Sequence, residues 1–218
     1  KFNLIILIII IVSLIIWGIS TIVATPIDET ISTASHELKV LNFNLGSEPS
    51  TLDPQLNKDL YGGSLINNMF EGLFRRVDNH IFPAIATEYK LSNDNLTYTF
   101  YFRKSKWSDE TSLTAYDFEF AWKRALYPSL GSEYAYQLFS IEGANDFFLG
   151  KISSDQVCVH ALDDFTLEVR LLTPTPYFID LLTSFTFMPS KKEAVQHVQD
   201  GSWATRAETA ISNGPFRL

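Results

Sequence analysis

The most constraining feature of the sequence is a long apolar run at its beginning. No charged residue lies between Phe2 and Ile27, and most positions in this run are Ile, Leu or Val. The segment from Phe2 to Ala24 would form a helix of roughly 34 Å at 1.5 Å per residue, which is enough to cross a hydrocarbon core about 30 Å thick. Lys1 precedes the run and acidic residues follow it. This charge order predicts that the rest of the chain lies outside the cytoplasm.

Two interpretations of this leader compete. A cleaved signal peptide has an apolar region of about 7–15 residues and a cleavage site of small residues. Ile22-Val23-Ala24 is a poor version of such a site, because Ile22 stands where a small residue is required. The length favours an uncleaved transmembrane anchor over residues 1–27, followed by a polar tether at 28–37 and a globular body at 38–218.

Composition restricts what this body can be. The 16 basic and 25 acidic residues after Ile27 give it a formal charge of −9. An aromatic content of 14%, with 17 Phe, is sufficient for a core and excludes a disordered chain. An acidic surface repels a phosphate backbone, so no nucleic-acid partner is expected.

The single cysteine, Cys158, excludes an intrachain disulfide and lies far from the leader, so it cannot be a lipid attachment site there. It stands between Val157 and Val159 in an alternating run, which predicts a buried and unreactive thiol.

Periodicity and breaker residues predict interleaved strands and helices in the body, typical of α/β or α+β layering. Two prolines, Pro49 and Pro54, predict an ordered loop at 48–54. The expected strands cover 38–45, 96–102 and 165–172, and the expected helices cover 59–70, 114–127, 177–182 and 190–198.

Helix starts are indicated by capping patterns. Thr114 with Asp117, and Ser190 with Glu193, have the spacing of a capping box. Asn93-Asp94-Asn95 predicts a turn before the strand at 96–102, because Asn and Asp tolerate left-handed backbone.

No pattern of catalytic residues is present. The four histidines, at positions 36, 80, 160 and 197, do not have metal-ligand spacing, and HExxH, CxxC, GxSxG, GxGxxG and P-loop motifs are missing from the sequence. Acidic pairs such as Asp109-Glu110 and Asp163-Asp164 are typical of solvated turns rather than of glycosidase carboxylates. We therefore predict no catalytic residue, no metal ligand and no cofactor, and we do not expect an enzyme.

An ordered set of motifs extends over most of the body. The motifs are GSEPSTLDP at 46–54, FEGL at 70–73, LTYTF at 96–100, WSD at 107–109, TAYDF at 114–118, WKR at 122–124, PTPYF at 174–178 and NGPF at 213–216. This set resembles the family-5 extracellular solute-binding proteins, the oligopeptide- and dipeptide-binding components of ABC importers. Three positions depart from the family pattern, since Asn95, Ser105 and Glu110 stand where glycines are usual. One residue is also missing before Trp107. The lipid-bearing cysteine of many relatives is also missing.

The resemblance implies an α/β fold of the type II periplasmic-binding-protein kind, of which this chain would hold only the first lobe. Residues 38–57 and 172–218 would form the core of the lobe and 58–171 an accessory subdomain, with a second lobe following. The implied function is extracytoplasmic peptide capture and delivery to ABC transporter permease subunits by a monomer on the surface or in the periplasm of a bacterium. Alternatives are a nickel chelate, haem or sugar ligand on the same fold, or, in another class, a membrane-bound hydrolase.

The resemblance also suggests ligand-contacting residues. Glu48, Pro49 and Ser50 match a loop at the lip of the family's cleft, where Glu48 would face an amine or a basic side chain; the alternative is that Glu48 caps a turn. Tyr134 matches a tyrosine that faces the cleft, and the alternative is that Tyr134 or Tyr136 is a half-buried core residue. Trp107, Phe118 and Trp122 are assigned to the core.

Overall fold

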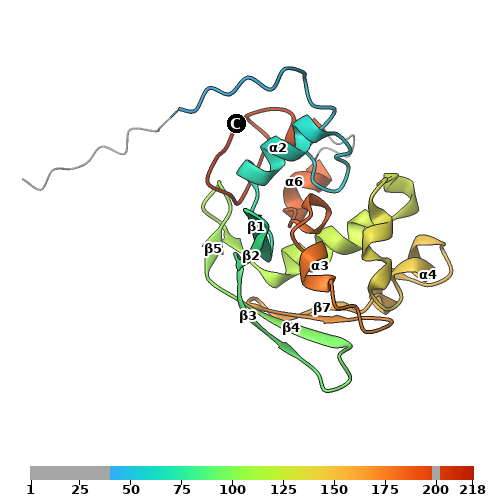
Figure 1. Ribbon diagram of the computed structural model, residues 1–218. Helices are drawn as coiled ribbons and strands as arrows, with labels where there is room; N and C mark the ends of the chain where they lie inside the picture. The colour runs from blue at the N-terminus through green and yellow to red at the C-terminus, as the bar shows by residue number, and fades with distance from the viewer. Residues whose placement is uncertain (1–39, 198–201) are drawn as a thin grey trace, which may run out of the picture. The chain divides into compact units, whose positions relative to one another are not determined.

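A four-stranded antiparallel sheet is the largest sheet of the computed structural model, which describes residues 40–197 and 202–218 (Figure 1). The strand order is β3-β4-β8-β7. Their bounds are Ala86–Leu91 for β3, Thr97–Phe102 for β4, Thr166–Arg170 for β8 and Val159–Asp163 for β7. The sheet belongs to a compact unit that extends from Leu45 to Leu218.

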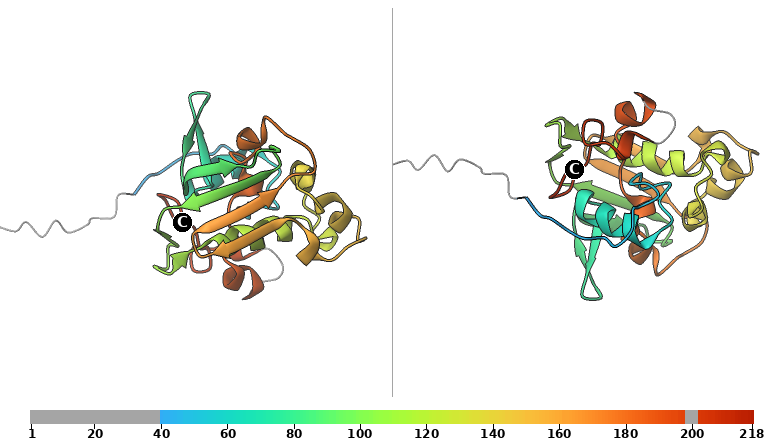
Figure 2. Two further views of the ribbon diagram at one scale, coloured as in Figure 1. Left: turned by 90° about the horizontal axis from the view of Figure 1, so that it is seen from below. Right: turned by 90° about the horizontal axis from the view of Figure 1, so that it is seen from above.

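The core forms on one face of this sheet, where the helices gather (Figure 2). Along β4, Tyr98, Phe100 and Phe102 are buried and alternate with more exposed residues, as expected for a strand with one covered face. Helix α3, Ala115–Ala125, covers that face and buries Phe118 and Trp122. The Phe102 and Phe118 rings meet edge to face at 5.1 Å. The predicted core positions of Phe118 and Trp122, and of Trp107 at 2% exposure, are confirmed.

Helix α3 begins as the capping pattern predicts. One carboxylate oxygen of Asp117 accepts hydrogen bonds from the Thr114 backbone N–H at 2.8 Å and from the Thr114 hydroxyl at 3.2 Å. The same oxygen accepts from Trp107 Nε1 at 3.3 Å. Burial raises the pKa of Asp117, and these hydrogen bonds oppose the rise.

Several tight turns keep a left-handed backbone without glycine, among them those at Asn95 and Glu110. Asn95, before β4, has φ of 58°, which confirms the predicted turn. Glu110 has φ of 68°, so the turn that glycine usually supplies in the resembling family is retained with a glutamate. A left-handed Glu is strained by its Cβ, and its carboxylate pairs with Lys106 at 2.9 Å.

The remaining elements are short helices, 3-10 turns and two hairpins. Helices are α2 (Leu60–Met69), α4 (Ala144–Phe148), α5 (Phe178–Leu181) and α6 (Lys192–His197), and 3-10 turns are η1 (Pro128–Leu130), η2 (Ala135–Ser140), η3 (Ser154–Gln156), η4 (Phe185–Phe187) and η5 (Ser202–Ala204). Two small hairpins pair β1 (Phe74–Val77) with β2 (His80–Pro83) and β5 (Ser105–Lys106) with β6 (Ser112–Leu113). The helices predicted at 59–70 and 177–182 are confirmed.

Three local predictions need correction. Residues 40–45 are not a strand, because alternation marks a half-buried surface but supplies no neighbouring strand to take its hydrogen bonds. Ser190 is not the cap of α6, because the helix begins at Lys192 and its first backbone bond, from Val195, goes to the Lys191 carbonyl. The Ser190 hydroxyl instead donates to Gln55 Oε1 at 2.5 Å. Cys158 is only partly buried, although burial does raise the pKa of its thiol.

The predicted membrane span at residues 2–24 lies outside the residues that the structure describes. Between 40 and 197 and between 202 and 218, no helix combines the length and the apolar character needed to cross a bilayer.

Candidate functional site

Ser50 is fixed to the first turn of α2 through Asp59. Residues 48–50 are called the ligand loop below. Asp59 is the N-cap of α2, and its Oδ1 accepts a hydrogen bond from the Gly62 N–H at 2.6 Å. Its other oxygen, Oδ2, accepts from the Ser50 N–H at 3.0 Å and from the Ser50 hydroxyl at 2.5 Å. The Gly62 bond, followed by the Ser50 bonds, lowers the pKa of Asp59.

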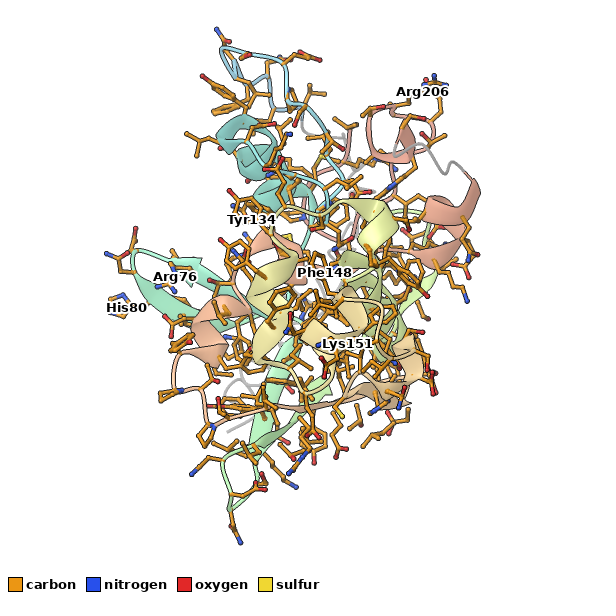
Figure 3. The ribbon with its side chains drawn as sticks, turned by 90° about the vertical axis from the view of Figure 1, so that its right-hand side faces the viewer. Arg76, His80, Tyr134, Phe148, Lys151 and Arg206 are labelled. Carbon is orange, nitrogen blue, oxygen red and sulfur yellow. The ribbon has the colours of Figure 1, made fainter. Side chains whose placement is uncertain are left out.

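Tyr134 lies on the same side of the protein. Residues 132–136, called the tyrosine segment, are joined to the residue before Asp59 by an ion pair between Lys58 and Glu133 at 2.9 Å. The half-buried Tyr134 ring packs edge to face on Phe185 at 5.6 Å. Phe185 in turn lies against α2, since a Cβ on Gly63 would be 3.6 Å from Phe185 Cε1. Figure 3 shows Tyr134 near α2.

The predicted ligand-contacting residues therefore belong to two segments that converge on the start of α2. Glu48 and Ser50 are exposed and Pro49 is half-buried. Within residues 40–197 and 202–218, the Glu48 carboxylate has no hydrogen bond or ion pair, so no contact supports the turn-capping alternative. The half-burial of Tyr134 is compatible with both of its interpretations.

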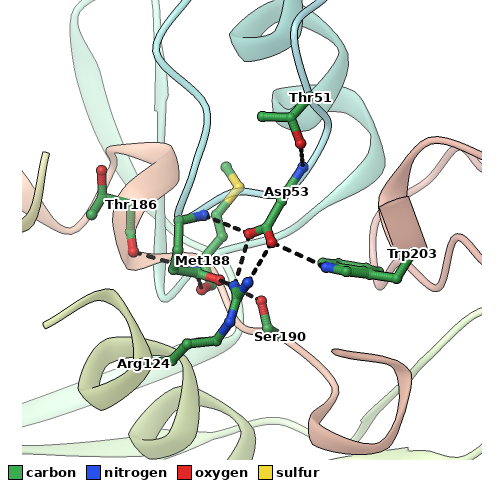
Figure 4. A network of polar contacts seen from close by, with 8 residues as sticks. Thr51, Asp53, Arg124, Thr186, Met188, Ser190 and Trp203 are labelled. Atoms are coloured by element: carbon green, nitrogen blue, oxygen red, sulfur yellow. Dashed lines mark hydrogen bonds and ion pairs between the residues drawn. The ribbon is translucent and has the colours of Figure 1, made fainter. Parts of the chain in front are cut away.

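A buried ion pair that the sequence analysis missed lies behind the ligand loop (Figure 4). Asp53 is fully buried, and its Oδ1 and Oδ2 accept from Arg124 Nη1 at 2.9 Å and Nη2 at 2.6 Å. Asp53 also accepts from the Gln55 N–H at 3.0 Å and from Trp203 Nε1 at 3.0 Å. Asp53 lies in the GSEPSTLDP motif and Arg124 in the WKR motif. No sequence periodicity predicts a contact between residues so far apart.

Gln55 extends this network to the C-terminal part of the chain. Its Oε1 accepts from Ser190 and from Arg124 Nη1, the latter at 3.1 Å, and its Nε2 donates to the Met188 carbonyl at 2.9 Å. The segment that follows the ligand loop is thus held by α3, by residues 188–190 and by η5. Buried polar groups that are paired in this way specify one conformation of the loop base.

The FEGL and NGPF motifs contact one another directly. Asn213 Oδ1 accepts from the Glu71 N–H at 3.0 Å, and Asn213 Nδ2 donates to the Glu71 carbonyl at 2.9 Å. The Gly214 N–H donates to the Met69 carbonyl at 2.8 Å. A Cβ on Gly214 would lie 2.6 Å from the Met69 carbonyl carbon, so this close approach of two backbones requires glycine.

Two surface grooves lie away from the ligand loop and the tyrosine segment. One, of about 630 Å³, lies beside the β1–β2 hairpin and is lined by Asn67, Phe70, Gly72, Phe74, Arg75, Arg76, Val77, Asp78, Thr183 and Met188. The other, of about 470 Å³, is lined by Trp107, Thr111, Ser112, Thr114, Tyr116, Asp117, Phe120, Lys191, Lys192 and Glu193. Within the described part of the chain, no three His, Cys, Asp or Glu residues are placed to hold a metal ion.

Comparison with known proteins adds independent evidence. A family model described as "Bacterial extracellular solute-binding proteins, family 5 Middle" matches residues 80–218. The oligopeptide-binding protein OppA of Bacillus subtilis is 42% identical over 181 residues, which cover 82% of this chain and 33% of the relative. The periplasmic murein peptide-binding protein MppA of Escherichia coli is 36% identical over 84% of this chain and 34% of its own length.

Solved structures of oligopeptide-binding proteins are similar to this chain as well. The substrate-binding domain of an oligopeptide ABC transporter from Bacillus anthracis superposes with a TM-score of 0.74 at 37% identity, covering 77% of this chain and 33% of that one. Haemophilus influenzae OppA in complex with the peptide RPPGFSPFR superposes with a TM-score of 0.76 at 31% identity, covering 80% and 34%. The chain spans about a third of the length of the relatives it matches.

Proposed function

Because this chain belongs to the bacterial extracellular solute-binding proteins of family 5, we propose that it is part of a receptor that captures peptides outside the cytoplasm and delivers them to an ABC transporter. The observation that carries the proposal is the 42% identity to an oligopeptide-binding protein over 181 residues. The family consists of solute-binding proteins, so an enzymatic activity is not proposed.

The ligand site proposed here consists of Glu48, Pro49, Ser50 and Tyr134. The Glu48 carboxylate is exposed and unpaired within the described residues, so it can meet an ammonium or a basic side chain without first breaking another contact. Ser50 and the tyrosine segment are both tethered to the start of α2. A small number of polar groups on a fixed frame is typical of ligand sites.

The whole receptor would contain a second lobe that closes on the peptide, would act as a monomer and would dock on permease subunits. Within this chain we propose a lobe core at 38–57 and 172–218 and an accessory subdomain at 58–171. The hydrogen bonds that Gln55 makes with Thr186, Met188 and Ser190 support the lobe core. The bonds between Asn213 and Glu71 join this core to the accessory subdomain. The sheet of β3, β4, β8 and β7 supports the accessory subdomain.

Calorimetric titration of the full-length protein with a mixture of tri- to pentapeptides tests the proposal. We expect saturable binding and intact peptides after incubation. Absence of heat with peptides, together with binding of a nickel chelate, haem or a sugar, would assign another solute to the same fold. Turnover of the peptides would overturn the non-enzymatic assignment.

We also propose that residues 1–27 anchor the receptor in the membrane, on the basis of the apolar length alone. The expected result is that the exported protein sediments with membranes and that its N-terminal sequence retains residues 2–24. A mature N-terminus at Thr25, with the protein released from membranes, would show instead that the leader is a cleaved signal peptide.

A further inference from the structure

Two neighbouring residues at the start of α2 each hold one segment of the proposed ligand site. Asp59 accepts both hydrogen bonds from Ser50 of the ligand loop. Lys58 pairs with Glu133 of the tyrosine segment. Lys58 and Glu133 are 75 residues apart in the sequence, so this contact joins two distant parts of the chain beside the ligand loop.

The carboxylate of Asp59 divides its two oxygens between two tasks. Oδ1 caps the helix through the Gly62 N–H, and Oδ2 takes the N–H and the hydroxyl proton of Ser50. A helix N-cap needs only one side-chain oxygen. The second oxygen therefore serves the loop rather than the helix. Because the Ser50 proton is directed at Asp59, the remaining lone pairs of the Ser50 oxygen are acceptors.

We propose that Lys58 and Asp59 are positioning residues, which hold the ligand loop and the tyrosine segment in their binding arrangement before a ligand arrives. This inference rests on the proposed function for its consequence, because order in the free protein lowers the cost of ordering side chains on binding. Asp59 sets the position of Ser50 and leaves its oxygen as an acceptor for ligand N–H groups. Lys58 sets the position of the segment that carries Tyr134.

Asp59→Ser separates positioning from helix capping. Serine is a good N-cap, but its single short oxygen cannot serve both Gly62 and Ser50. We expect Asp59→Ser to lower the melting temperature by no more than about 2–4 °C, because the cap is kept and only the bonds to Ser50 are lost. Hydrogen exchange at the Ser50 amide should be faster in the ligand-free protein. Affinity for the tri- to pentapeptide mixture should weaken about three- to tenfold, as expected for ordering one or two more side chains on binding.

Lys58→Met tests the second contact, and Lys151→Met is its matched control. The Lys151–Asp146 pair has a similar length, 3.1 Å, and its side chains are 61% and 53% exposed, close to the 54% and 61% of Lys58 and Glu133. Only Lys58→Met should speed hydrogen exchange at residues 132–136 and lower peptide affinity, by about two- to threefold, since an exposed pair contributes little. The exchanged pair Lys58→Glu with Glu133→Lys should recover the affinity that Lys58→Glu alone loses.

Hydrogen exchange keeps this inference separable from the proposed function. If the Ser50 amide exchanges at the wild-type rate in Asp59→Ser, Asp59 does not position the loop, whatever the wild-type protein binds. If exchange speeds up but peptide affinity is unchanged, the positioning role in binding is also wrong. If the wild-type protein binds no peptide, the proposed function is wrong, and the exchange data alone decide whether Asp59 and Lys58 order the two segments.

Discussion

Replacing Asp53 with alanine is expected to lower the free energy of unfolding by about 3–5 kcal/mol, the usual cost of removing one partner from a buried ion pair. The Arg124 side chain is only 9% exposed and would lose hydrogen bonds of 2.9 and 2.6 Å. The Trp203 and Gln55 N–H groups would each lose an acceptor as well. Urea unfolding at neutral pH, followed by tryptophan fluorescence, measures the change.

Two variants show whether burial causes this loss. Arg76→Met breaks the Arg76–Asp180 pair, which has a similar length of 2.9 Å but side chains 40% and 52% exposed, so we expect a loss of no more than about 1 kcal/mol. The double variant Asp53→Leu with Arg124→Met removes both charges and should recover the part of the stability that Asp53→Ala loses through the unpaired Arg124. The Trp203 and Gln55 N–H groups remain without their acceptor in both variants. A loss in Asp53→Ala as small as that in Arg76→Met would contradict the assigned role of the network.

Local patterns in the sequence predicted the elements whose causes are local. Alternation in the segment at 96–102 identifies β4, because successive side chains of a strand face opposite sides. Thr114 and Asp117 identify the start of α3, because the capping bonds extend over only three residues. At Asn95 the signal is equally local, since its left-handed backbone depends on one residue.

Features that depend on distant partners could not be predicted in this way. The alternation at 38–45 predicts a surface suited to a strand, but a strand forms only where a neighbour accepts its hydrogen bonds, and residues 40–45 are not a strand. Ser190 has the spacing of a helix cap, yet its hydroxyl is taken by Gln55, 135 residues away. Short-range rules assign such a serine to the helix because they contain no information on what lies across the core.

In the candidate site, too, individual residues could be predicted from the sequence, but their contacts with distant residues could not. The resemblance suggested Ser50 and Tyr134 as separate positions, and the structure connects both to the start of α2. Asp59 was recognisable only as the start of a helix, because the second use of its carboxylate depends on how the preceding loop returns to α2. The pairing of Asp53 with Arg124 was hidden for the same reason, since the two residues are 71 apart in the sequence.

Gly214→Ala is expected to destabilise the protein by about 1–3 kcal/mol, the range for added atoms in a well-packed region. The new Cβ would lie 2.6 Å from the Met69 carbonyl carbon and 2.7 Å from its oxygen. These are backbone atoms, so they cannot rotate away. The clash must lengthen the 2.8 Å hydrogen bond from the Gly214 N–H to the Met69 carbonyl and displace Asn213 from Glu71.

Gly72→Ala is the matched control, because Gly72 lies in the FEGL motif at the same junction. Its Cβ would meet only ordinary contacts of 3.5 Å, to the carbonyl oxygens of Leu182 and Phe74, and its φ is not positive. Alanine also restricts the unfolded chain, so this variant should be neutral or slightly stabilising. Urea unfolding of both variants measures the difference, and equal free energies for Gly214→Ala and Gly72→Ala would show that the two motifs can separate without cost. A large difference would mean that the close contact of the NGPF segment with Met69, the last residue of α2, contributes to the stability of the fold.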